Sequence, residues 1–190
     1  MSVLSSSLSL VVLALVFSAP QTAGPETFDV VGKLTPKGAS AAGAITVPMI
    51  LQVDRYSPEF ERTRMTDGLT HGGYPGFLTA LRGVSAVGSL EVAGEKFVIR
   101  WAREVPTATG RTLSFVTDTP VFFVGVGRRG AKPTAGYEVA VIQLTVDKAG
   151  KGTGTMAAAA RVKPGGETGV RIDRYEDQPV ALTATLRPAR

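Results

Sequence analysis

His71 is the only histidine of the chain, and so the first residue to consider for hydrolysis or metal binding. A Ser-His-Asp hydrolase needs an oriented nucleophile, and no G-x-S-x-G motif presents a serine. A zinc site needs further nitrogen or sulfur ligands, and the chain has no second histidine and no cysteine. Because Gly72 and Gly73 follow it, we expect His71 in a glycine-rich loop near the mouth of the domain.

Two pairs of carboxylates are the next candidates. A glycosidase sets two carboxyl groups across a cleft and keeps one of them protonated by burial. Glu59 and Glu61 are two positions apart in a predicted helix and point to different sides, while Glu176 and Asp177 are adjacent in a predicted loop. Neither spacing predicts a catalytic pair. We expect the first two to stabilise the start of the helix and to pair with nearby arginines.

The segment Asp147–Gly152 combines an acid, two lysines and two glycines. One carboxylate beside lysines is a poor calcium site, and a phosphate-binding loop would lead into a helix, whereas a strand is predicted here. The segment therefore predicts a hairpin turn. With no motif left to assign, we expect no catalytic residue, no metal ion and no cofactor.

The composition indicates a folded domain with a modest positive charge. Hydrophobic residues make up 44% of the chain and charged residues 19%, which is typical of a packed core. The formal net charge is +5, and the densest basic cluster is Arg128, Arg129 and Lys132, in a predicted loop. Nucleic-acid binding would need a basic stripe with interleaved aromatic residues, so no nucleic-acid partner is expected.

The clearest predicted strand covers residues 45–53, where apolar residues alternate with a second set of side chains. A period of two places the apolar set on one face, against a core. Pro48 interrupts this strand and has no N–H to donate to a neighbour. The strand should therefore lie at a sheet edge or carry a bulge at Pro48.

Similar patterns predict eight to ten strands separated by glycine turns. The remaining segments are 28–34, 87–92, 97–102, 112–117, 121–126, 137–146, 153–162, 169–174 and 180–186. Residues 121–126 form a continuous apolar run, so we expect that strand to be covered on both sides. Consecutive hairpins predict an all-β fold, mainly an antiparallel meander. It would be barrel-like, since closure removes exposed edges, or a two-sheet sandwich.

A helical insert is predicted at about residues 57–83. Ser57–Glu59 has the hydroxyl, proline and acid typical of a helix start. We expect the helix to end near Thr66, before Asp67–Gly68, and a glycine-rich break to follow. Phe77–Leu81 should then form a second short helical turn.

The first 23 residues predict a secretory signal. Leu8–Phe17 is an uncharged apolar run too short to span a bilayer, and small residues favour cleavage between Ala23 and Gly24. Residues 1–23 are thus an expected signal peptide and 24–190 a single β-rich domain, secreted or periplasmic. No later segment is apolar enough to be an integral membrane segment.

The insert should lie over one end of the barrel and line a mouth there. The residues expected at this ligand-binding mouth are Tyr56, His71, Tyr74 and Phe77. Aromatic side chains on the strands would either line an interior cavity or fill the core; these are Phe97, Trp101, Phe115, Phe122 and Phe123. Separately, Val53–Tyr56 is echoed by Ile172–Tyr175, which could mark two equivalent strand ends or a coincidence.

The stretch 53–186 contains the motifs V-D-R-Y-S-P-E and F-L-T-A-L-R and the hairpin Y-E-V-A-V-I-Q-L-T-V-D-K-A-G-K-G-T-G. On these motifs it resembles a family of short exported bacterial proteins known only as uncharacterised. These motifs are caps, turns and strand ends. The resemblance therefore implies an exported β domain and carries no activity, ligand or catalytic residue.

Three functions stay open on the sequence. The first is an envelope module that binds a small apolar ligand inside the barrel. The second is a structural or protein-interaction domain with a packed interior, whose partner would be an envelope protein. The third is a hydrolase using His71 or a carboxylate pair, for which no motif is present.

Overall fold

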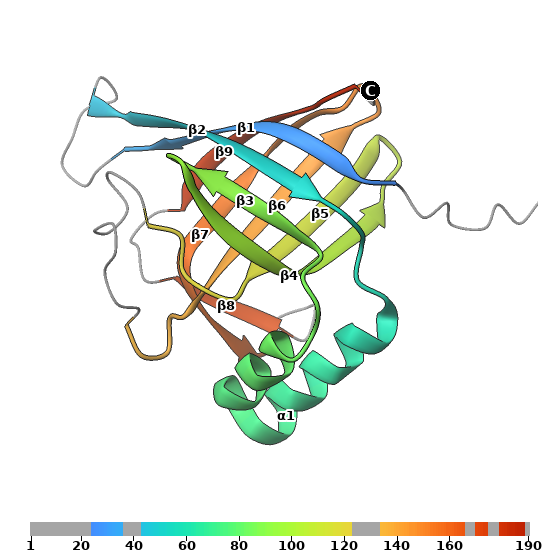
Figure 1. The fold of residues 1–190 in the computed structure, drawn as a ribbon, viewed down its shortest axis with the longest axis vertical. Helices are drawn as coiled ribbons and strands as arrows, with labels where there is room; N and C mark the ends of the chain where they lie inside the picture. The colour runs from blue at the N-terminus through green and yellow to red at the C-terminus, as the bar shows by residue number, and fades with distance from the viewer. Residues whose placement is uncertain (1–23, 36–42, 123–133, 166–169, 175–178, 189–190) are drawn as a thin grey trace, which may run out of the picture.

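The computed structural model describes residues 24–35, 43–122, 134–165, 170–174 and 179–188, and within them it contains nine strands and one helix (Figure 1). In chain order these are β1 (Glu26–Leu34), β2 (Ile45–Val53), α1 (Glu59–Arg82), β3 (Gly88–Val92), β4 (Glu95–Pro106), β5 (Gly110–Thr117), β6 (Val139–Asp147), β7 (Lys151–Pro164), β8 (Val170–Arg174) and β9 (Val180–Leu186). The predicted signal peptide and the basic cluster Arg128, Arg129 and Lys132 lie outside the described residues.

Eight of the strands close into an antiparallel barrel. Strands β1 to β6 pair in a meander in which β1, β2, β3, β4, β5 and β6 follow in order, with α1 between β2 and β3, and β6 pairs with β7. Strand β9 then closes the ring by pairing with both β7 and β1. The all-β prediction is confirmed, in its barrel form. The predicted meander is interrupted at β8, because β8 pairs only with the C-terminal part of β7 and is not one of the eight strands of the barrel.

The barrel interior is filled by side chains. Alternate residues of the strands point inward and form one buried cluster, with Phe28, Leu51, Phe115, Ile142 and Met156 among its largest fully buried members. Burial of one such side chain contributes about 1.5–3 kcal/mol. The interior is therefore the main source of stability for a chain without disulfides.

A β-bulge changes which aromatic residues point inward. The β4–β5 register shifts between Ile99 and Trp101, so Phe97 and Ile99 face the interior while Trp101 packs outside, near α1. The expectation that Trp101 lines or fills the interior, as Phe97 does, was wrong. After the bulge, Ala102 takes the inward position.

The prediction for Pro48 holds locally. Strand β2 pairs with β1 over its whole length but with β3 only from Met49 onward. Over Ile45–Pro48 the strand thus has a single described neighbour, which is the edge position expected around a proline.

The strand predicted over 121–126 is wrong where the structure describes it. Val121 and Phe122 are not in a strand, although the Val121 amide donates to the Ala158 carbonyl of β7 at 2.8 Å. Phe123 and the rest of that run lie outside the described residues. Val121 is fully buried in the barrel core, which explains the apolar character without a strand.

Helix α1 is longer than predicted and kinked. It continues through Asp67–Gly68, and its break falls at Gly73, whose φ of 60° and ψ of −155° are not helical. The left-handed φ is one that glycine adopts readily, unlike residues with a side chain. His71 therefore lies in the helix, not in a loop. The predicted helix cap was also wrong. The Ser57 hydroxyl accepts a hydrogen bond from the Ala102 amide of β4, and no side chain caps the start of the helix.

The two arms of α1 fold back on each other and pack on the outer wall of the barrel (Figure 1). Their buried side chains form one buried cluster with outward-facing residues of β5, β6 and β7. Four consecutive buried alanines, Ala157–Ala160, lie in the part of β7 where this happens. Small side chains there let the helix approach the sheet closely. Within the described part of the chain, no helix combines the length and apolar character that crossing a membrane requires.

Candidate functional site

The four residues predicted at a ligand mouth do not converge on one pocket. Tyr56 packs against the barrel interior, whereas Tyr74 and Phe77 are buried between α1 and the outer wall. His71 is exposed, and its Nδ1 lies 3.0 Å from the Asp67 carbonyl one helical turn earlier. The helix thus covers a wall of the barrel, and none of these four residues lines either of the two pockets described below.

Tyr74 ties the second arm of α1 to the sheet. Its hydroxyl donates to the Ala160 carbonyl at 3.3 Å and accepts from the Glu138 amide at 3.0 Å, and the Arg161 guanidinium lies 5.8 Å from the ring centre. The pKa of Tyr74 is raised, mainly because burial disfavours the phenolate. This tyrosine is therefore held neutral and acts as an anchor.

A polar group closes one end of the barrel, and we call Glu26, Tyr56, Glu104 and Arg111 the mouth cluster. The Arg111 guanidinium donates to Glu26 at 2.6 Å and to Glu104 at 3.0 Å. The Tyr56 hydroxyl donates to the second oxygen of Glu26 at 2.7 Å. Arg111 also lies 6.0 Å above the ring of Phe28, so the cluster sits directly on the apolar core.

The inward position of two members of this cluster could have been predicted from the alternation of residues along their strands. Glu26 continues the inward series of Phe28 and Val30 in β1, and Arg111 continues the series of Leu113 and Phe115 in β5. Extending each apolar series by one step would have placed both charges inward. Glu104 follows the β4 bulge, so a simple period of two could not have located it.

The electrostatics of the mouth cluster favour a structural role. Burial and the hydrogen bond to Glu26 raise the pKa of Tyr56 well above its ordinary value. Burial opposes the charged form of Arg111, but hydrogen bonds to Glu26 and Glu104 outweigh this and raise its pKa. Both carboxylates are engaged by one guanidinium, unlike the separated pair that flanks a glycosidic bond.

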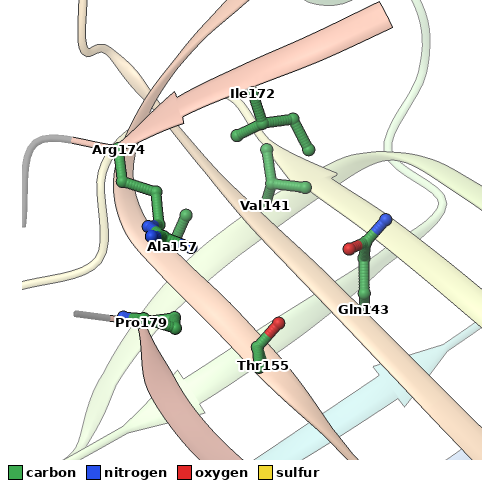
Figure 2. Close-up of a pocket in the computed structure, with 7 residues that line it drawn as sticks. All are labelled: Val141, Gln143, Thr155, Ala157, Ile172, Arg174 and Pro179. Carbon is green, nitrogen blue, oxygen red and sulfur yellow. The ribbon is translucent and has the colours of Figure 1, made fainter. Parts of the chain in front are cut away.

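The second candidate is a pocket on the outer wall, between β8 and the face of β6 and β7 (Figure 2). Its volume is about 80 Å³. We call it the outer-wall pocket and define it by the residues that line it: Val141, Gln143, Thr155, Ala157, Ile172, Arg174 and Pro179. Its formation depends on β8 leaving the ring, because the pocket lies between β8 and the barrel wall.

The lining of this pocket divides into an apolar floor and a polar rim. Val141 and Ala157 are buried, whereas Gln143, Thr155 and Arg174 are exposed and carry an amide, a hydroxyl and a guanidinium. In Figure 2 the Arg174 side chain turns back from β8 toward Ala157. The arrangement offers hydrogen-bond donors around a small apolar base.

Arg174 belongs to the second of the two similar segments, Val53–Tyr56 and Ile172–Tyr175, and the arginines of the two segments make different contacts. Arg55, in the first segment, forms an ion pair with Glu61 at 3.1 Å. Among the residues that the structure describes, none forms an ion pair with Arg174. The sequence could point to this position but could not show which contacts its side chain makes.

A second hollow lies where the two ends of the described chain meet, between residues 24–27 and 186–188. No group of three or more histidine, aspartate or glutamate side chains suited to a metal ion occurs in the described ranges. Comparison with protein-family models, with curated proteins and with solved structures gave no match for this chain.

Proposed function

We propose that this chain is an exported protein-interaction domain that uses the outer wall of a filled barrel to bind an envelope or secreted protein. The observation that carries the proposal is the packed interior. Barrels that bind small apolar molecules keep a cavity for them, and such pockets measure about 300–1,000 Å³. Here inward side chains from all eight barrel strands meet in one buried cluster.

The outer wall of the barrel carries a candidate binding surface. It offers the outer-wall pocket and, beside it, strands β7 and β8, whose described residues from Ala160 to Pro164 and from Val170 to Arg174 include four cations, Arg161, Lys163, Arg171 and Arg174, and one acid, Asp173. Arg174 on the rim of a small concave site, with further cations on the other face of the same two strands, is suited to an acidic protein surface. The hydrolase alternative gains no support from the mouth cluster, whose carboxylates share one arginine.

Export is part of the proposal because residues 1–23 match a secretory signal. The intact mass of the protein recovered from the periplasm or the medium tests it. A chain beginning at Gly24 is expected. A protein retained in the cytosol with residues 1–23 attached would contradict this part of the proposal.

Site-specific photocrosslinking tests the interaction role. A photoreactive amino acid would replace Gln143 at the outer-wall pocket or, as the control, exposed Glu91 of β3 on the opposite side of the ring. We expect a discrete protein adduct from position 143 in intact cells and none from position 91.

A thermal-shift screen of the same exported protein tests the filled interior. We expect no change in melting temperature with long-chain fatty acids or aromatic small molecules. A saturable rise with one of them, together with equal crosslinking at both positions, would favour the small-ligand module instead.

A further inference from the structure

We propose that the outer-wall pocket receives one carboxylate side chain, aspartate or glutamate, from an acidic segment of the partner protein, with Arg174 as its charge partner. This inference rests on the proposed function, since it names the chemistry that the interaction surface recognises. Three properties of the pocket carry it: its size, the state of Arg174, and the balance between polar and apolar lining.

The size selects a side chain and not a metabolite. A volume of about 80 Å³ holds a carboxyl group with one or two methylenes, well below the pockets that enclose whole small molecules. The floor of Val141 and Ala157 suits the methylenes, while the rim of Gln143 and Thr155 suits the carboxyl oxygens. Figure 2 shows these polar side chains on the β6 and β7 strands, facing the space beneath β8.

The charge of Arg174 faces the outer-wall pocket and has no ion-pair partner among the described residues. Its neighbour Asp173 is engaged by Lys163 and lies 3.3 Å from Arg171, on the other face of the hairpin. Hydrogen bonding to Lys163 also lowers the pKa of Asp173, so this acid stays committed to those two cations. Arg174 has no such partner in the described part of the chain, and it rises from the wall of a concave site.

A carboxylate fits this site better than a phosphate. A guanidinium binds either group through a pair of parallel hydrogen bonds. A phosphate, however, carries up to two negative charges and is commonly held by several cations, whereas Arg174 is the one cation among the described residues that line this pocket. Four of the seven described lining residues are aliphatic, which would cost a phosphate its hydration without compensation.

Fluorescence anisotropy with defined peptides tests the assignment on the exported protein. The probe is a labelled peptide with two glutamates spaced by glycines, and the comparison peptide has glutamine in place of glutamate. We expect saturable binding of the glutamate peptide only. We expect Arg174→Gln to weaken it about tenfold, the effect of losing one hydrogen-bonded charge pair, and Arg174→Lys to restore part of the affinity.

The matched control is Arg171→Gln, which removes the same charge from the same strand outside the pocket. It should weaken binding less than threefold, and both variants should melt like the parent. Equal losses in the two variants would overturn the pocket and leave only general attraction to a basic hairpin. Tighter binding of inorganic phosphate, or of free glutamate, than of the peptide would overturn the ligand class.

The two proposals can fail separately. If position 143 crosslinks to a protein while no glutamate peptide binds, the interaction surface stands and the carboxylate assignment falls. If fatty acids stabilise the protein and position 143 gives no adduct, the proposed function itself falls.

Discussion

At the scale of single residues, the contribution of an arginine–carboxylate ion pair to stability depends on how deeply the pair is buried. Arg111 pairs with Glu26 and Glu104 at the end of the barrel core, with side-chain exposures of 17%, 14% and 27%. Arg187 pairs with Asp29 on the surface, with exposures of 43% and 57%. Removing one partner from a buried group leaves the others uncompensated, whereas solvent replaces a surface partner.

We therefore predict that Arg111→Met lowers the free energy of unfolding by about 2–3 kcal/mol. This is below the 3–5 kcal/mol of a fully buried pair because the cluster is partly solvated. Methionine keeps an apolar side chain over Phe28. The loss of stability would therefore come from removal of the charge and not from a cavity. Urea denaturation measures the change.

Arg187→Met is the matched control and should cost at most about 1 kcal/mol. If both variants lose the same amount, the mouth cluster contributes no more than a surface ion pair. The assignment of Glu26 and Glu104 as buried partners of the barrel closure would then be wrong.

At the scale of elements, α1 shows how glycines set the path of the chain. The two arms of the kinked helix cross where Gly68 meets Gly76, and no side chain fits between them. A Cβ on Gly68 would lie 2.7 Å from the Gly76 carbonyl oxygen, and a Cβ on Gly76 would lie 2.3 Å from the Gly68 carbonyl oxygen. Both neighbours are backbone atoms, which cannot turn aside as a side chain can. We expected the helix to end at Asp67–Gly68 because glycine often ends a helix. Gly68 instead lets the backbones of the two arms approach closely.

We predict that Gly68→Ala and Gly76→Ala each destabilise the protein by about 1–3 kcal/mol, the range for overpacking a close contact. Gly72→Ala should act in the opposite direction and stabilise by up to about 1 kcal/mol, because alanine is the better helix former and a Cβ there meets nothing within 4 Å. Thermal unfolding of the three variants gives the comparison. Stabilisation by alanine at all three positions would contradict the tight crossing.

At the scale of the whole molecule, local pattern and long-range register contribute different parts of the fold. Alternation over residues 45–53 and the glycine turns, such as Ala93–Gly94 with its two positive φ angles, are local, so they could be predicted. The return of β9 between β7 and β1 depends on which edges remain free after seven strands have paired, and no local residue encodes it.

The candidate site follows the same division. The echo containing Arg174 is visible in the sequence, but the outer-wall pocket combines residues of three strands and the start of β9, brought together by register alone. The four residues predicted at the mouth were placed by assuming that the insert covers an open end. The helix packs on the wall where Ala157 and Ala160 present small side chains, which matters only once β6 and β7 are paired.

Closure through β1 and β9 also brings the ends of the described chain together. The Arg187 amide donates to the Thr27 carbonyl at 2.8 Å, so the last strand leaves the barrel beside the start of the first.

If the closed ring is what stabilises the molecule, the position of the chain ends should matter little. A circular permutant that joins residue 188 to residue 24 through a short glycine-serine linker, and opens the exposed turn at Ala93–Gly94, should fold. We expect one cooperative thermal transition within about 10 °C of the parent, since one strained turn and one hairpin connection are lost while the inward cluster is kept. A second permutant opened inside β2 at Met49, where both neighbours are paired, should lose cooperative unfolding. Equal behaviour of the two permutants would show that the pairing of β2 with β1 and β3 is not needed for the ring, and the closed barrel would no longer explain the stability of the chain.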